Sequence, residues 1–206
     1  MKAPSRTASW LSFPVLEDWL RSVVETPGLT SLTEPSEARR MLLEDSLRGV
    51  DLVRSFDGPI VDVGSGGGAP GIPLAAALPA REVTLLEAER QKADFLRRWE
   101  SELPNLRVVW GRAEEQATDE FGVAVAKALA LPPVAAEWCL PLVREGGAVV
   151  IWVGPSAEID RVARVADQLA AGPPEDHGGL LVLRKLGPTP KGFPRRPGMA
   201  RKRPLA

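Results

Sequence analysis

Apolar residues recur at three- and four-residue steps through the first quarter of the chain, the spacing that places side chains on one face of a helix. Pro35-Ser36-Glu37 has the proline and acidic residue typical of a helix start, and Thr26-Pro27-Gly28 predicts a turn before it. Residues 1–55 are therefore predicted to form a helical extension packed on a core formed by residues 56–206. The apolar residues that carry the spacing are Trp10, Phe13, Leu16 and Leu20, then less regularly Met41, Leu43 and Leu47.

From Gly58 onward the pattern changes to short apolar runs separated mostly by helical intervals, notably 90–102 and 132–143. Such alternation predicts βαβ units, and thus an α/β fold with a mostly parallel sheet covered on both faces. Sheets of this kind bind ligands beyond the carboxyl ends of their strands. The predicted strands are Ile60–Val63, Val83–Leu86, Leu106–Trp110, Val123–Ala126, Ala148–Val153 and Leu180–Leu183.

Composition, the single cysteine and the lengths of the apolar runs predict the cellular compartment. The 206 residues are 44% hydrophobic and 26% charged, as in ordinary globular proteins. The single cysteine, Cys139, excludes an internal disulfide and is predicted to be a buried core residue. Ser12 and Pro14 interrupt the apolar stretch of residues 10–16, and no run approaches the ~20 residues of a membrane span, so we expect a cytoplasmic protein.

Charge is distributed unevenly along the chain. Eight lysines and arginines and no acid lie between Arg184 and the end, whereas the preceding 183 residues carry a net charge of −9. A tail of one sign predicts either a polyanionic partner such as RNA or a solvated, solubilising segment.

The first predicted strand ends at the glycine-rich segment 64–71, which from Gly66 fits the spacing G-x-G-x-x-G of dinucleotide-binding loops. Three residues favour S-adenosylmethionine over a dinucleotide. Pro70 lacks the N–H that a pyrophosphate would need, and Asp62, at the strand end, can anchor polar groups of a methionine moiety directly or through water. Glu87, closing the second strand, can accept hydrogen bonds from both ribose hydroxyls, a contact that either ligand needs; a solvated strand end is the alternative.

Two further segments are candidates for the same site. The segment Gly111–Glu115 follows the third strand, where backbone N–H groups and a side-chain acceptor can meet an adenine edge; an acidic helix start is the alternative. Lys127 ends the fourth strand, which places a cation at the cleft.

At these residues the chain resembles the bacterial small-subunit (16S) ribosomal RNA guanine-N7 methyltransferases, the RsmG/GidB family. The most specific match is Val61–Leu74, which ends in Pro-Gly-Ile-Pro-Leu. The tail segment 190–198 resembles the family's Pro-Arg-Arg-Pro-Gly signature, and in the amino-terminal part Gly28-Leu29-Thr30 and Asp45-Ser46-Leu47 fit more loosely. Other matching segments, in order, are Leu85-Leu86-Glu87, Gly111–Glu115, Leu140-Pro141-Leu142 and Gly146-Gly147.

The resemblance implies a Rossmann-like class I S-adenosylmethionine-dependent methyltransferase with a mostly parallel seven-stranded sheet. Leu42, Lys127 and Trp152 depart from the family, which usually has histidine, arginine and lysine there. Glu87 would hold the ribose, and Ala113 and Glu114 the adenine. The expected cofactor-binding residues are Asp62, Gly64, Ser65, Gly66, Gly68, Ala69, Glu87, Ala88, Ala113, Glu114 and Lys127.

Guanine N7 has a free lone pair and no proton, so its methylation needs no general base. We expect Lys127 to be the catalytic residue by orienting the guanine, and His177 to be solvated. No metal and no obligate protein partner are expected; the partner is small-subunit ribosomal RNA or the ribosomal particle. The residues expected to bind RNA are Arg195, Arg196, Arg201, Lys202 and Arg203, unless the segment Pro194–Pro197 docks on the protein instead.

Other functions stay open from the sequence. The methyl acceptor could be a small molecule or a protein, or the chain could be a cofactor-binding, RNA-associated module with little turnover. A nicotinamide-dependent oxidoreductase is the most distant alternative.

Overall fold

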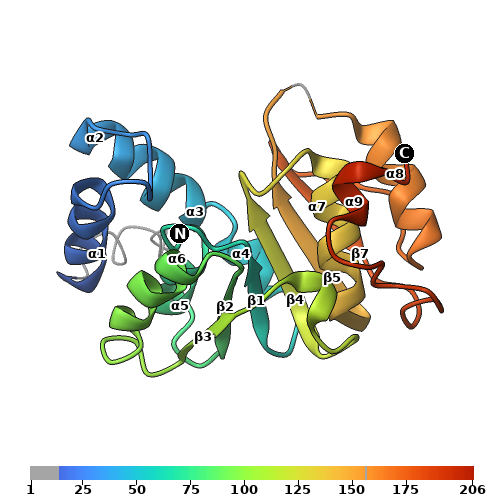
Figure 1. Cartoon of the computed structure of the whole chain (residues 1–206), viewed down its shortest axis with the longest axis horizontal. Coiled ribbons are helices and arrows are strands. Elements are labelled where there is room, and N and C mark those ends of the chain that lie inside the picture. The colour runs from blue at the N-terminus through green and yellow to red at the C-terminus, as the bar shows by residue number, and fades with distance from the viewer. Residues whose placement is uncertain (1–13, 156) are drawn as a thin grey trace, which may run out of the picture.

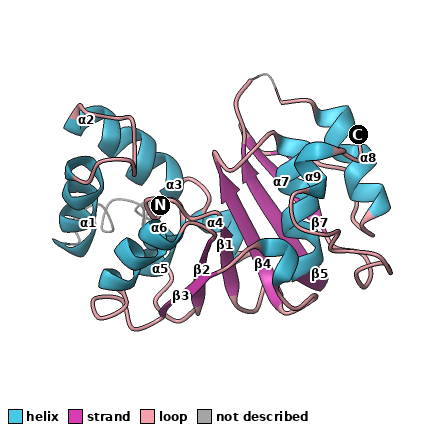
Figure 2. Ribbon diagram, in the orientation of Figure 1, coloured by secondary structure: helices cyan, strands magenta, loops and turns pink. Residues whose placement is uncertain are grey.

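The structure is a computed structural model that describes residues 14–155 and 157–206, and its centre is one seven-stranded sheet (Figures 1 and 2). The strand order is β3-β2-β1-β4-β5-β7-β6, with β1 to β5 parallel and β7 antiparallel to both of its neighbours. The predicted Rossmann-like, mostly parallel seven-stranded fold is therefore confirmed. The strands are β1 Ile60–Val63, β2 Val83–Glu87, β3 Leu106–Trp110, β4 Phe121–Lys127, β5 Val143–Trp152, β6 Glu175–Asp176 and β7 Leu180–Arg184.

Helices cover both faces of the sheet (Figure 2). One side carries α1 Pro14–Glu25, α2 Pro35–Ala38, the π-helical turns η3 Arg39–Glu44, α3 Asp45–Leu47, α4 Val50–Arg54, α5 Gly71–Ala77 and α6 Arg90–Leu96 with its 3-10 end η4 Arg97–Trp99. The other side carries α7 Pro132–Cys139 with η6 Leu140–Leu142, α8 Ile159–Gln168 and α9 Met199–Lys202. A short 3-10 turn, η5 Ala113–Glu115, follows β3.

An apolar core lies between each helical layer and the sheet, and the strands contribute side chains to both cores. In β4, Val123 and Val125 belong to the core on the α5 side, while Ala124 and Ala126 belong to the core on the α7 side. All four side chains are fully buried, because successive residues of a strand point to opposite faces and both faces are covered. This explains why the strands read as nearly continuous apolar runs in the sequence.

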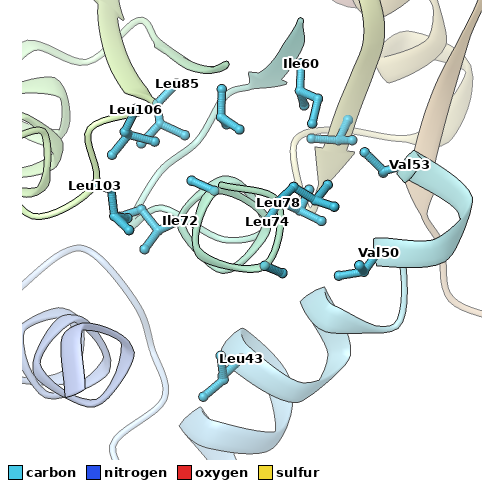
Figure 3. Close-up of a cluster of buried hydrophobic side chains, with 14 of the residues drawn as sticks. Leu43, Val50, Val53, Ile60, Ile72, Leu74, Leu78, Leu85, Leu103 and Leu106 are labelled. Carbon is cyan, nitrogen blue, oxygen red and sulfur yellow. The ribbon is translucent and has the colours of Figure 1, made fainter. Parts of the chain in front are cut away.

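The amino-terminal helices share a core with the sheet. Leu43, Val50 and Val53 lie on one side of α5, which Figure 3 shows end-on, and Ile60 and Leu85 of the strands lie on the other. The indole of Trp19 from α1 is fully buried in the same cluster. Residues 14–54 are thus packed directly against the half of the sheet that contains β1 and β2, which brings α1 and η3 to the ligand-binding edge.

Several elements differ in extent from the expectation. Strand β5 begins at Val143, directly after η6 and five residues earlier than predicted. Val143 pairs with Phe121 of β4, and after a register shift the regular pairing begins with Val123 and Ala148. Glu175–Asp176 forms the short strand β6, which the sequence did not predict. Both residues are exposed, so the strand has no apolar pattern by which it could be recognised. The helical intervals 90–102 and 132–143 end in 3-10 turns.

Three other expectations concern single positions or segments. Cys139 is fully buried, as predicted, and burial raises the pKa of its thiol. Trp10 and Phe13 lie outside the described residues. None of the helices in the described part of the chain has both the length and the apolar character needed to cross a membrane.

Candidate cofactor and substrate site

A cavity of about 680 Å³ lies at the carboxyl ends of β1, β2 and β4, within the range of sizes typical of ligand sites. Four groups of residues meet in it. Helix α1, the segment 29–32 and η3 form one wall, and the glycine loop forms the floor. The segments 86–89 and 111–114 form a second wall, and residues 127–129, Trp138, Gly198 and Arg201 complete the lining.

Backbone hydrogen bonds within the glycine loop and to the end of β2 hold the loop in place. Gly64 N–H donates to the carbonyl of Leu86 at 2.8 Å, and Gly68 N–H donates to that of Ser65 at 2.7 Å. Gly68 has φ +107°, and a Cβ there would lie 2.5 Å from the Ile72 side chain, so only glycine fits. Of the predicted loop residues, Gly64, Ser65, Gly66 and Ala69 line the cavity, whereas Gly68 shapes the loop beneath it.

The carboxylate of Glu87 lines the cavity and is anchored from two sides. Its Oε2 accepts the Gly66 N–H and its Oε1 accepts the Glu89 N–H, both at 2.8 Å. Each carboxylate oxygen retains lone-pair capacity after one backbone bond, so a vicinal diol can still be accepted. The residue is 6% exposed, which fixes its position before any ligand arrives. Ala88 lines the same wall.

Asp62 lies behind the loop instead of on the cavity surface. It is fully buried, and its Oδ2 accepts the Gly71 N–H at 3.0 Å. A Cβ on Gly71 would lie 2.7 Å from that oxygen, so the glycine is what permits the bond. Burial raises the pKa of Asp62 to about 7, and its Oδ1 has no hydrogen-bond partner in the described part of the chain. Contact with a cofactor from here would have to pass through water or a loop movement.

Lys127 reaches the cavity from the end of β4 and has a carboxylate partner. Its Nζ lies 3.4 Å from Asp45 Oδ2, and its side chain is 12% exposed. Asp45 is itself fixed, because its Oδ1 accepts a bond from Arg48 at 2.7 Å and its backbone carbonyl accepts the Trp152 indole N–H at 2.9 Å. Trp152 therefore serves to brace the amino-terminal helices, which accounts structurally for an aromatic ring at this position.

The far end of the cavity is formed by Ala113 and Glu114 together with the tail of the chain. Glu114 Oε1 accepts the Gly198 N–H at 3.0 Å, so this carboxylate, expected to face adenine, is engaged with the tail. Arg201 lies 5.1 Å from the ring centre of Trp138, and both line the cavity. The adenine end of the expected site is thus adjacent to residues from three distant parts of the sequence.

The basic tail is docked at its centre. Arg195 donates to both carboxylate oxygens of Glu137, at 2.6 and 2.7 Å, and Glu137 is 4% exposed. This geometry favours, for Arg195, the alternative that the segment docks on the protein. Arg196, Arg201, Lys202 and Arg203 are exposed, and of these only Arg201 also lines the cavity. His177, also exposed, does not line the cavity.

The sequence alone did not identify several residues that line the cavity or hold its lining residues in place. Trp19 donates from its indole N–H to the Gly67 carbonyl at 2.8 Å and so ties α1 to the glycine loop. Asp45, Glu137 and Trp138 act through contacts with residues more than 50 positions away. No local signal distinguishes such side chains from ordinary helix residues; the loose match at Asp45-Ser46-Leu47 was the single hint.

The chain is similar in sequence to one family of known proteins. Residues 15–171 match the family model GidB, described as rRNA small subunit methyltransferase G. The chain belongs to this family. Ribosomal RNA small subunit methyltransferase G of Pelotomaculum thermopropionicum is 38% identical over 198 residues, 86% of this chain and 83% of the relative. The protein of the same name from Synechococcus elongatus is 35% identical over 199 residues, 86% of this chain and 82% of the relative. As a GidB-family protein, the chain is an S-adenosylmethionine-dependent methyltransferase.

Solved structures bear out the fold of this GidB-family chain. A SAM-dependent O-methyltransferase from Thermotoga maritima aligns with a TM-score of 0.56 at 14% identity, covering 80% of this chain and 73% of that one. Geranyl diphosphate methyltransferase, solved with SAM, aligns with a TM-score of 0.54 at 15% identity, covering 76% of each chain. At such low identity the likeness concerns the fold alone.

Proposed function

We propose that this protein transfers a methyl group from S-adenosylmethionine to N7 of a guanine in 16S ribosomal RNA, in the cytoplasm. One observation carries the proposal: a single cavity contains both the glycine loop with Glu87 and the strand-end cation Lys127. A cofactor held at the first would meet a base oriented by the second. Family membership and the names of the relatives give the substrate class.

The residues fit the cofactor. Glu87 presents a preorganised carboxylate suited to a ribose diol, and segment 64–69 offers a floor without bulky side chains. The cofactor supplies an electrophilic methyl group on a positively charged sulfur. Gly64, Ser65, Gly66, Ala69, Ala88 and Ala113 are proposed as its other contacts, with Gly68 and Asp62 shaping the loop.

The chain would need no general base for this reaction, since guanine N7 has a lone pair and no proton. As the bond from N7 to the methyl carbon formed, the carbon–sulfur bond would break and its electron pair would leave with S-adenosylhomocysteine. Its task is to hold the acceptor nitrogen in line with the methyl group, and good orientation is worth on the order of 7–11 kcal/mol. We assign Lys127 to orienting the guanine through its O6 edge. Asp45 restrains the ammonium group at 3.4 Å, which limits the positions that the cation can take.

The ribosomal RNA would be gripped by the exposed cations of the tail, Arg196, Lys202 and Arg203. A guanine inside a stacked helix presents N7 poorly to a cavity, so the target would lie in a loop or be extruded.

Replacing these three residues together with alanine is expected to weaken RNA binding and to reduce the slope of log K against log salt by about 2–3, because fewer counterions are released. The affinity for S-adenosylhomocysteine should be unchanged, since the three side chains do not line the cavity. Fluorescence anisotropy over a salt series measures the first quantity and calorimetry the second. An unchanged salt slope would show that the RNA lies elsewhere.

The deciding experiment is mass spectrometry of small-subunit ribosomal RNA from cells with and without the gene. We expect one 7-methylguanosine to be missing from the deletion strain and to be restored by the purified protein with S-adenosylmethionine. Identical modification profiles in the two strains would reject the proposed substrate.

A further inference from the structure

We propose that Arg201, in the carboxyl-terminal tail, is a cofactor-binding residue at the adenine end of the cavity, and that cofactor binding therefore stabilises the docked tail. The inference rests on the assignment of this cavity to S-adenosylmethionine and on the docking geometry of residues 195–203. It extends the cofactor site to a helix, α9, that lies beyond the residues matched by the family model.

Two hydrogen-bonded contacts fix the tail next to Arg201. The first is the two-point bond from the Arg195 guanidinium to the buried carboxylate of Glu137 on α7. Planar bidentate pairs of this kind define orientation as well as attachment. The second is the bond from Gly198 N–H to Glu114 Oε1, made at a turn in which Gly198 has φ +81°. Ala200 is then 2% exposed, so α9 is seated on the protein.

These two attachments place Arg201 over the ring of Trp138, at 5.1 Å. Figure 1 shows α9 in red lying against α7, far in sequence but adjacent in space. A guanidinium stacked on an indole has its rotamer restricted, so it loses less entropy when it contacts a ligand. Arg201 and Gly198 line the same cavity as Ala113 and Glu114, which follow the third strand.

The chemistry at this end suits adenine. Its ring nitrogens accept hydrogen bonds, and its faces stack against planar cations and aromatic rings. Arg201 supplies both a planar face and several N–H donors. Because Glu114 is shared between the adenine wall and the tail, filling the cavity and docking α9 involve the same residues. By thermodynamic linkage, the free energy by which the docked tail strengthens cofactor binding equals the free energy by which bound cofactor stabilises the docked tail.

The positions of the exposed cations Arg196, Lys202 and Arg203 would then depend on cofactor binding. They flank the docked residues, so their arrangement depends on whether α9 is seated. A protein loaded with cofactor would present these cations in a fixed pattern, whereas the unloaded protein would do so less often.

The test compares Arg201→Met with Lys191→Met, which removes the same charge from an exposed position in the same tail. Methionine retains a long apolar stem over Trp138 but has no donors. Calorimetry with S-adenosylhomocysteine should show about tenfold weaker binding for Arg201→Met and a change below about twofold for Lys191→Met.

A second measurement uses the unmodified protein. Lys202 N–H donates to the Gly198 carbonyl and Arg203 N–H to that of Met199, so both amides report on the seating of α9. Hydrogen exchange of a peptide covering residues 197–206 should slow when S-adenosylhomocysteine is added. Wild-type affinity in Arg201→Met, or equal exchange with and without the ligand, would overturn the proposal. Neither readout involves RNA, so both are independent of the ribosomal RNA test.

Discussion

Replacing Asp62 with asparagine is expected to raise the free energy of unfolding at pH 8 by on the order of 4 kcal/mol in the ligand-free protein. Burial raises the pKa of this carboxyl from 3.8 to about 7. Between these values the folded protein holds a proton that the unfolded chain releases, so stability falls as pH rises from about 4 to about 7 and stays low above it. Asparagine carries no charge at any of these pH values and still offers an oxygen to the Gly71 N–H.

Denaturant titrations at pH 4.5 and pH 8 would measure the effect as a difference between the two proteins. The difference should be small at pH 4.5 and reach its full size at pH 8. Glu89→Gln is the matched control, because it removes a carboxylate that is exposed and paired on the surface with Lys92. Equal pH dependence of wild type and Asp62→Asn would show that the buried carboxyl does not carry the proton.

The second large effect is expected for Lys127→Ala, which should lower kcat/KM for methyl transfer to ribosomal RNA by about 100-fold. Removing one preorganised polar group at a reacting centre typically costs 10²–10³ in rate. The ammonium group lines the cavity and is restrained by Asp45 at 3.4 Å, so the substitution removes the cation held at the end of β4. Steady-state kinetics with tritiated cofactor would measure the change.

Lys127→Arg provides the conservative comparison and should retain most of the activity, since arginine restores the charge and adds a planar two-point fork. Arg107→Ala is a control at the opposite, amino end of a strand, where it should leave the kinetics unchanged. Methyl transfer by Lys127→Ala at the wild-type rate would remove Lys127 from the mechanism.

Lys127 and Asp62 differ in how well the local sequence pattern predicts where their side chains lie. Lys127 was found from the sequence because it ends an apolar run, and a residue at the carboxyl end of a buried parallel strand must face the ligand edge. Asp62 is the last residue but one of a similar run, yet the structure places it behind Gly71, because the loop folds back over its side chain. Strand position is local information, while coverage by the following loop is not.

The tail also combines features that the local sequence predicts with contacts that it does not predict. Its charge and its Pro-Arg-Arg-Pro-Gly segment are visible in the sequence, but Arg195 and Arg201 differ from Arg196 only in what lies beneath them. Glu137 and Trp138 come from α7, about 60 residues earlier, and no period or composition links them to the tail.

The sequence alone determined the sheet, the glycine loop and the carboxylate Glu87, because these depend on alternation of apolar and polar positions and on turn chemistry within a few residues. It also carried the family resemblance that Pro-Gly-Ile-Pro makes specific. Only the tertiary structure decided which cations face solvent, which acid restrains Lys127, and that the tail closes one end of the cavity. Those facts depend on contacts between side chains tens of residues apart, whose partners are chosen by packing of the whole chain and not by any local pattern.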